Sequence, residues 1–269
     1  MTATNVPNAL TLWIWIFSAL SVGNSIMSAM KLKRSNDRKV ANAVSKNGKT
    51  PTIANTFGLP AGKNFSCPGA TSVCETVCYA GKLEKIYKGV KATLLHNWEL
   101  LRNADMDTMS LLLSDMIADF IVDCEKRNAE KLFRIHWDGD FFNDTYAYAW
   151  KAVIENNPDI QFWVYTRVKS AALILKDISN LSLYFSTDDE NKEIAHDLRK
   201  NNDGIRLAYL GKTFAVTENT MKELIGKPGA KCPENNKQIK LISTNGSACV
   251  SCGLCVYGKA DVRFSASKK

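Results

Sequence analysis

The residues best suited to chemistry are cysteines, which fall into two groups toward opposite ends of the chain. Seven of the eight cysteines in this 269-residue protein belong to one group or the other. The N-terminal group is Cys67, Cys74 and Cys78, and the C-terminal group is Cys232, Cys249, Cys252 and Cys255. Because grouped thiolates are ligands for soft metals and iron–sulfur clusters, the sequence predicts two metal centres.

The C-terminal group has enough ligands for a complete site. Two residues separate Cys249 from Cys252, and two more separate Cys252 from Cys255, as in ferredoxin-type loops, while Cys232 is available as the fourth ligand. This spacing favours a [4Fe-4S] cluster. Zinc is the alternative because it also accepts four cysteines. A disulfide framework is the weakest interpretation, since an α/β chain of this size does not need one.

The N-terminal group is one ligand short of a closed tetrahedral site. Either Cys124 or a histidine such as His96 completes a structural zinc site, or one iron of a cluster keeps an open position. An open iron can bind a substrate or cosubstrate directly. Cys124 lies on the apolar face of a predicted helix, where a free cysteine is commonly a small core residue. Chemistry is therefore expected at the N-terminal group.

Polar residues follow three successive predicted strands. They are Asp138, Gly139 and Asp140, then Thr166 and Arg167, then Ser186, Thr187, Asp188 and Asp189. Chemistry in α/β barrels collects at the carboxyl ends of the strands, so one shared site is expected, with Asp138, Asp140 and Arg167 as catalytic candidates. Two alternatives stay open. Asp138, Asp140 and Asp189 merely cap helices, or Asp138 and Asp140 bind Mg²⁺ for phosphodiester chemistry.

The elements that position these residues alternate between strand and helix. Apolar runs predict strands at Leu132–Trp137, Gln161–Thr166, Leu181–Ser186 and Ile205–Leu210, and helical periodicity predicts helices over 109–124, Asn143–Asn156, Ser170–Ile178 and Asp189–Lys200. This alternation is typical of parallel βα units. The predicted fold is an α/β barrel or partial barrel with a small C-terminal cysteine-rich module, and an open doubly wound sheet is the second choice.

Three segments are predicted: residues 1–49, the barrel domain at 50–228, and the cysteine-rich module at 229–269. The net charge is +8, but residues 1–50 alone hold +6, so the basicity belongs to the N-terminal segment. Residues 9–30 are uncharged and long enough to anchor the chain in a membrane, and the basic residues after them would keep the domain cytoplasmic. Alternatively, the working protein starts near Met30.

Several motifs together resemble the phage "gene product 88" family over roughly residues 50–266. They are Phe57-Gly58-Leu59-Pro60-Ala61-Gly62, Cys67-Pro68-Gly69-Ala70-Thr71, Cys74, Cys78-Tyr79-Ala80, His136-x-Asp138-Gly139-Asp140-Phe141-Phe142, Cys232-Pro233 and the three C-terminal cysteines. The resemblance implies a phage protein in the host cytoplasm. It implies no particular reaction, because the family has no settled activity.

The order of motifs is also similar to that of radical S-adenosylmethionine enzymes. That similarity implies that Cys67, Cys74 and Cys78 hold a [4Fe-4S] cluster whose fourth iron chelates S-adenosylmethionine. One-electron reduction, from an electron donor, would then give a 5′-deoxyadenosyl radical that abstracts hydrogen from a substrate. The Asp138-Gly139-Asp140 turn would meet the methionine amine, and Ser186 or Asp188 the ribose or carboxylate. The cysteine gaps of six and three residues, and Asp140 in place of a glutamate, depart from the usual motif.

The competing class is a nucleic-acid-binding or structural protein that metal centres stabilise without catalysis. One helix is predicted over Lys82–Arg102, in which lysines alternate with Tyr87 and Trp98. Lysine and aromatic residues on one helix can bind phosphates and stack on bases. The same pattern also fits a solvated amphipathic face.

Overall fold

The computed structural model describes residues 30–40, 52–243 and 246–267 of the chain. Its centre is a seven-stranded sheet with the strand order β1-β2-β3-β4-β5-β9-β6. All neighbouring strands in this sheet are parallel. The strands are β1 (Thr56–Gly58), β2 (Leu132–Asp138), β3 (Gln161–Thr166), β4 (Leu181–Thr187), β5 (Arg206–Gly211), β6 (Ala230–Lys231) and β9 (Val262–Ser265). A separate antiparallel pair joins β7 (Ile242–Ser243) to β8 (Gly246–Ser247).

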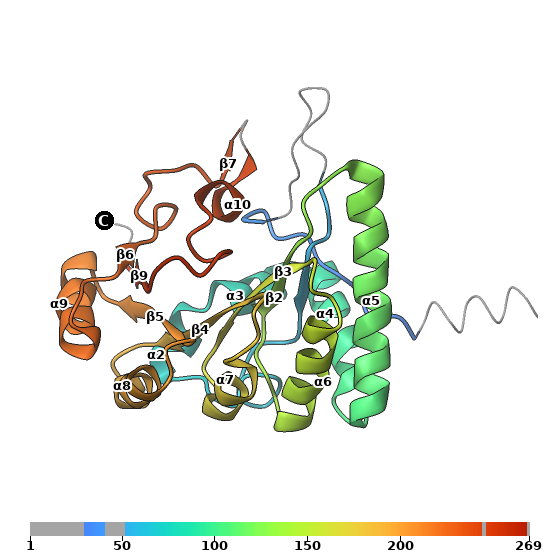
Figure 1. The fold of residues 1–269 in the computed structure, drawn as a ribbon, viewed down its shortest axis with the longest axis horizontal. Helices are drawn as coiled ribbons and strands as arrows, with labels where there is room; N and C mark the ends of the chain where they lie inside the picture. Colours follow the sequence, from blue (N-terminus) through green and yellow to red (C-terminus); the bar gives the residue numbers. More distant parts are fainter. Residues whose placement is uncertain (1–29, 41–51, 244–245, 268–269) are drawn as a thin grey trace, which may run out of the picture.

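The first five strands lie side by side in chain order, and the connections between them are helical. The helices are α2 (Ser72–Val77), α3 (Tyr79–Ile86), α4 (Lys88–Leu101), α5 (Met106–Arg127), α6 (Asp144–Glu155), α7 (Lys169–Leu175), α8 (Lys192–Asn201), α9 (Phe214–Ile225) and α10 (Ala248–Cys252). Figure 1 shows α5, α6, α7 and α8 along one face of the sheet, and the C-terminal segment with α10 on the other. The strand order follows because parallel crossovers share one hand.

The predicted alternation of strands and helices is confirmed, with two differences. The sheet is open, because no pairing joins β1 to β6 in the part of the chain that the structure describes, so a closed barrel is not formed. The helix predicted over Lys82–Arg102 is two helices, since the backbone of Tyr87 is extended (φ −111°, ψ 102°) and separates α3 from α4. The predicted cap Asn143 is confirmed: its side chain accepts a hydrogen bond from the Tyr146 amide.

The core between the sheet and the helices is rich in aromatic side chains. Phe133 of β2 packs edge-on against Phe120 of α5, with ring centroids 5.1 Å apart, and against Phe162 of β3 at 6.0 Å. Trp150 of α6 is fully buried beside Phe133. Such pairs add about 0.5–1.5 kcal/mol each beyond the burial of apolar area, so they fix the helices on this face.

The opposite face of the sheet is covered by the C-terminal segment. Trp163 of β3 and Leu132 of β2 pack with Val256, while Tyr184 of β4 packs with Val262. The Tyr184 hydroxyl donates to the carbonyl oxygens of Leu254 and Ala260 at 3.2 and 3.0 Å. Because β6 and β9 pair within the main sheet, the C-terminal residues are part of the central fold as well as its cover.

Residues 30–40 contact both the sheet and the C-terminal cysteine segment. Ser35 forms an antiparallel bridge with Thr56, and the Cys249 amide donates to the Lys39 carbonyl oxygen at 3.0 Å. Asp37 forms a buried ion pair with Arg134 of β2, with Nη1 and Oδ2 2.6 Å apart. The predicted domain boundaries stay predictions, but these contacts tie part of the N-terminal segment to both the sheet and the C-terminal cysteines.

The membrane-anchor prediction concerns residues 9–30, nearly all of which lie outside the described residues. Within residues 30–40, 52–243 and 246–267, no helix combines the length and the apolar character that a bilayer span requires.

The Asp37–Arg134 pair gives the first prediction. The two side chains are only 9% and 12% exposed, so Asp37→Asn leaves a buried guanidinium without its counter-ion. We expect a loss of about 3–5 kcal/mol in the free energy of unfolding, measured by urea denaturation. The matched control is Lys31→Ala, which removes an ion pair to Asp119 whose side chains are half exposed and should cost about 1 kcal/mol or less. Equal losses for the two variants would contradict the prediction.

Candidate functional site

The N-terminal cysteines lie on the loop that follows β1. The Cys67 amide donates to the Gly62 carbonyl oxygen at 3.1 Å, and the Ala70 amide donates to the Cys67 carbonyl oxygen at the same distance. Thr71 then caps α2 by accepting a hydrogen bond from the Cys74 amide at 3.0 Å. Cys78 caps α3, since its Sγ accepts from the Gly81 amide at 3.3 Å. Local turns and two short helices thus set the backbone of all three cysteines.

A buried hydrogen-bond network holds this loop against the ends of β3 and β4. The Thr71 hydroxyl donates to Asp188 Oδ2 at 2.5 Å, and Arg167 Nη1 lies 2.8 Å from the same oxygen. Arg167 Nη1 also donates to Thr71 Oγ1 at 3.3 Å. The side chains of Arg167 and Asp188 are 7% and 1% exposed, so the ion pair is screened from solvent. Two predicted site residues therefore do meet the cysteine loop.

Asp140 joins the end of β2 to the end of β3. Its Oδ1 accepts from the Thr166 hydroxyl at 2.6 Å and from the Phe141 amide at 2.8 Å, and its Oδ2 accepts from the Arg167 amide at 2.7 Å. Burial raises the pKa of Asp140 to about 6, and these hydrogen bonds oppose the rise. Three donors of the protein therefore occupy the Asp140 carboxylate.

Two glycines allow the loop to lie this close to the strand ends. A Cβ at Gly69 would stand 2.6 Å from the Arg167 carbonyl oxygen. A Cβ at Gly139 would stand 2.5 Å from Ser66 Oγ, and the Gly139 φ of +82° is in the left-handed region that favours glycine. Ser66 itself is buried, with its hydroxyl donating to the Pro60 carbonyl oxygen at 2.7 Å. Gly139, predicted to bind a cofactor, therefore also has a packing role.

A bulge in β2 decides which side chains reach the site. The pairing with β1 advances from Arg134 to Asp138 while β1 advances only from Thr56 to Gly58, and His136 in between has a φ of +58°. His136 is consequently turned into the aromatic core, where its Nε2 lies 2.9 Å from the Tyr146 hydroxyl. Burial lowers the pKa of His136 to about 3, so this imidazole is neutral. A bulge commonly re-aims a strand in this way.

Asp138 follows the bulge, and its carboxyl group is buried. Its Oδ1 accepts from the Gly139 amide at 2.9 Å, whereas its Oδ2 is buried without a hydrogen-bond partner among the described residues. Burial raises the pKa of Asp138, and the nearby carboxylate of Glu84 raises it further. Glu84 of α3 also accepts from the Ala61 amide at 2.8 Å. Sequence reasoning missed Glu84, because nothing in its spacing links α3 to β2.

The three N-terminal thiols share the neighbourhood of these charges. Burial raises the pKa of Cys67, and Asp140 adds to that rise. Burial also raises the pKa of Cys74, but the Arg167 cation opposes it. Burial raises the pKa of Cys78, and Asp138 acts in the same direction. The thiols therefore favour the protonated state until a cation binds to them.

The remaining predicted residues are placed as follows. Ser186 is half-buried near the end of β4, with its carbonyl oxygen bonded to the Asn191 side chain at 3.2 Å. Cys124 is buried on the helical side of the sheet, and His96 bonds to the Lys31 carbonyl oxygen. Neither is joined to the cysteine loop by these contacts. The helix-capping alternative fails for Asp189, which instead accepts a hydrogen bond from the Tyr209 hydroxyl at 2.6 Å.

The C-terminal cysteines gather around Cys255 on the face of the sheet opposite α5, α6, α7 and α8. The pKa of Cys255 is raised chiefly by burial and also by the neighbouring thiols of Cys232 and Cys252. Cys249 likewise interacts with Cys255, while Arg134 and Lys39 stabilise its thiolate form. Arg134 was missed from sequence, although a lone cation in an otherwise apolar strand is a usable signal.

Both cysteine groups have the donor atoms that a metal site needs, but in the described residues these donors are not positioned as metal ligands. Four thiols fit the chemistry of a closed cluster or zinc site, and three fit a cluster with one open position. Among the residues that the structure describes, however, no three His, Cys, Asp or Glu side chains are arranged so as to hold a metal ion. The seven cysteines stay predicted ligands.

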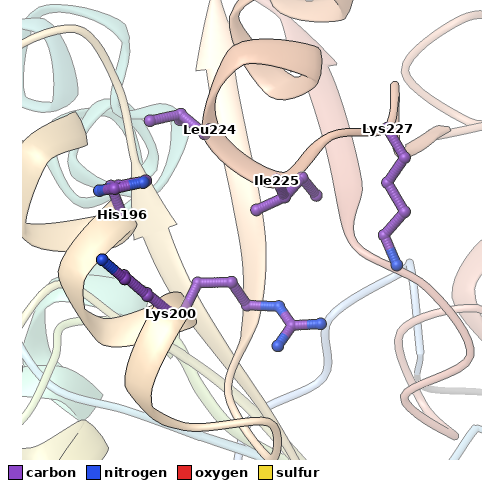
Figure 2. Close-up of a pocket in the computed structure, with 6 residues that line it drawn as sticks. His196, Lys200, Leu224, Ile225 and Lys227 are labelled. Carbon is purple, nitrogen blue, oxygen red and sulfur yellow. The ribbon is translucent and has the colours of Figure 1, made fainter.

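A surface cavity of about 490 Å³ lies apart from these groups (Figure 2). It is lined by residues of α8, of the end of α9 and of the turn after it: His196, Arg199, Lys200, Leu224, Ile225 and Lys227. Arg199 and Lys227 both approach the buried carboxylate of Asp261, at 3.7 and 3.4 Å. Two of its basic side chains are thus already paired with Asp261. None of the predicted site residues lines the cavity.

The close approach at Gly69 gives the second prediction. Gly69→Ala places a methyl group against the Arg167 backbone, so we expect a loss of about 1–3 kcal/mol in stability and faster proteolysis between residues 60 and 80. Gly89→Ala on α4 is the matched control, because its Cβ meets nothing within 4 Å and should raise stability by about 0.5–1 kcal/mol. Thermal denaturation and mass spectrometry of the fragments measure both effects. An unchanged cleavage pattern for Gly69→Ala would refute the contact.

The raised pKa of Asp138 gives the third prediction. A buried carboxyl with a raised pKa binds its proton more tightly in the folded state, so stability falls as the pH rises above the ordinary carboxyl value of about 4. We expect Asp138→Asn to weaken this fall, by up to about 1.4 kcal/mol per pH unit. Asp105→Asn is the control, because hydrogen bonds from Thr108 lower the pKa of that carboxyl. Identical pH–stability curves for wild type and Asp138→Asn would disprove the assignment.

Comparison with known proteins places the chain in a family. The family model described as "Gene product 88" matches residues 30–258. The Gene 88 protein of Mycobacterium phage L5 is 54% identical over 244 residues, covering 89% of this chain and 99% of that protein. The Gene 88 protein of Mycobacterium phage D29 is 53% identical over 244 residues, covering 88% of this chain and 99% of that protein. No solved structure matches the chain. The protein is therefore a member of the phage gene product 88 family.

Proposed function

We propose that this protein is an iron–sulfur enzyme that uses S-adenosylmethionine, with its active site at the carboxyl edge of the sheet. Cys67, Cys74 and Cys78 would hold a [4Fe-4S] cluster with one open iron. Cys232, Cys249, Cys252 and Cys255 would hold a second cluster that relays electrons or stabilises the fold. When bound, the first cluster would supply the electron for reductive cleavage of the sulfonium.

One observation carries the proposal. The loop with three cysteines follows the first strand of a sequentially ordered parallel sheet, and Thr71 ties it to Asp188 and Arg167 at the ends of the third and fourth strands. Ligands of α/β sheets bind at this edge because the strand ends and the loops after them converge there. We interpret the sheet as an incomplete barrel for the same reason, since its first five strands follow chain order.

The side chains of this edge suit a zwitterionic cosubstrate. Asp138 Oδ2 is buried beside Glu84, and the proximity of the two carboxyl groups raises the pKa of Asp138, so the pair lacks a counter-charge. The pair would accept hydrogen bonds from an ammonium group. Ser186 near the end of β4 is half-buried, and its hydroxyl would bind a ribose or carboxylate.

Arg167 would stabilise the thiolate form of Cys74 by its positive charge. It is buried between Asp188 and the loop, and its cation favours the thiolate form of Cys74. Metal binding requires thiolates and releases their protons, so a fixed cation beside Cys74 would lower the cost of loading the site. Asp140 would hold Arg167 in place through the Arg167 backbone amide.

A protein without catalysis is the second candidate, and one observation favours it. Asp140 and Asp188 are both occupied by hydrogen bonds from the protein itself. Polar strand ends used in this way stabilise loops without binding a substrate. In that case the cysteines would hold zinc or a structural cluster, and function would lie in binding a partner.

Anaerobic purification with iron and sulfide analysis tests the proposal and is the fourth prediction. We expect about eight irons per chain for two clusters, and release of 5′-deoxyadenosine after reduction with S-adenosylmethionine. Cys74→Ala should retain about four irons and release none of the nucleoside, because its site loses a ligand. Zinc in place of iron would sink the proposal.

Cys124→Ala is the matched control, since this buried thiol lies on the helical side of the sheet and donates to the Glu130 carbonyl oxygen at 3.7 Å. We expect wild-type iron content and nucleoside release from it. Cys252→Ala should lose the C-terminal cluster and keep the other. About four irons in the wild type, unaffected by Cys74→Ala, would favour a structural protein with a single C-terminal cluster.

A further inference from the structure

The joint between α3 and α4 carries a group of exposed cations. Lys82 and Lys85 lie on α3, and Lys88 and Lys91 lie on α4. All four are exposed, and none of them takes part in an ion pair within the described residues. Glu84 is the only acid between Lys82 and Lys91, and it is directed inward to the Ala61 amide. The joint is therefore a concentrated positive patch.

An exposed aromatic ring stands within this patch. Tyr87 is 55% exposed, as a residue of the joint itself. Its backbone is held on both sides, because its amide donates to the Leu83 carbonyl oxygen at 2.8 Å and its carbonyl oxygen accepts from the Lys91 amide at 3.1 Å. The ring is thus presented from a fixed backbone with lysines before and after it. Proteins that bind single-stranded nucleic acid combine cations, which contact the phosphates, with aromatic rings, on which the bases stack.

The patch leads along α4 toward the cysteine loop. Trp98 lies near the C-terminal end of α4, about 16 Å along the helix from Tyr87. Phe65 of the cysteine loop packs edge-on against Trp98, with ring centroids 6.1 Å apart, and is itself 41% exposed. At the other end, Cys78 caps α3 only four residues before Lys82. Both ends of the surface therefore adjoin the predicted site.

We propose that single-stranded nucleic acid binds along this surface, with its phosphates on Lys82, Lys85, Lys88 and Lys91 and a base stacked on Tyr87. Resting on the function proposed above, this assigns a nucleic-acid strand as the substrate class of the cysteine-loop site. An anionic membrane is less suitable, because Ile86 is the one large aliphatic side chain exposed among the described residues of the joint, whereas a membrane-bound helix needs an apolar face. Duplex is also disfavoured, since its stacked bases are not available to Tyr87.

Fluorescence anisotropy with a labelled oligothymidylate tests the proposal on the full chain, purified anaerobically. We expect the dissociation constant to rise about 50-fold between about 50 and 200 mM salt, as for four phosphate contacts. The variant Lys82→Gln/Lys85→Gln/Lys88→Gln/Lys91→Gln should abolish most of this salt dependence. Tyr87→Leu should weaken binding about tenfold through lost stacking, without changing the salt dependence.

The matched control is Lys126→Gln/Lys200→Gln/Lys212→Gln/Lys240→Gln, which removes the same charge from exposed positions elsewhere. We expect wild-type affinity from it. Equal weakening in the two quadruple variants, duplex binding as tight as single-strand binding, or binding to phosphatidylglycerol vesicles without binding to the oligonucleotide would each overturn the proposal.

Iron analysis of the same preparations separates this inference from the proposed chemistry. Protein without iron that still binds the oligonucleotide through these lysines supports the nucleic-acid surface and removes the iron–sulfur enzyme. If the protein contains both clusters but does not bind the oligonucleotide, the nucleic-acid surface is refuted and the proposed enzyme is not.

Discussion

The buried ion pair of Arg167 and Asp188 is the interaction on which the arrangement of the candidate site depends. It joins the ends of β3 and β4, and the Thr71 hydroxyl adds the cysteine loop to the same oxygen. Removing one partner of a buried pair leaves an uncompensated charge, so the three groups hold one another in a single arrangement. Glu190, just after β4, adds an exposed contact by accepting hydrogen bonds from the Ser72 and Val73 amides beside Cys74 at 3.0 and 3.3 Å.

A second buried arginine organises the other face of the sheet. Arg134 pairs with Asp37, lies over the Tyr165 ring at 5.6 Å, and stabilises the thiolate form of Cys249. Arg134 thus adds a shared charge contact that links residues 30–40 and Cys249 to the sheet. The two cysteine groups are therefore unlike in setting. The N-terminal group adjoins carboxylates at an edge, and the C-terminal group lies against aromatic rings and cations.

Much of the fold was predictable from local pattern. The strands at 132–138, 161–166 and 181–187, and the helix capped by Asn143, follow from apolar periodicity and capping chemistry. The break at Tyr87 was missed although Gly89 stands two residues after it, because an isolated glycine inside a helical pattern does not by itself mark the end of a helix. The open edge of the sheet was also beyond reach, since closure depends on distant pairings such as β9 beside β5 and β6.

By itself, the sequence determined the donor chemistry of this protein: seven cysteines in two groups, polar residues after successive strands, and lysines interleaved with aromatic residues on one helical segment. Tertiary structure alone decided which of them meet. The bulge in β2 turns His136 into the core and leaves Asp138 facing Glu84, and Gly69 lets the cysteine loop rest on Arg167. These outcomes depend on contacts between residues far apart in the chain, where sterics and burial outweigh local preference.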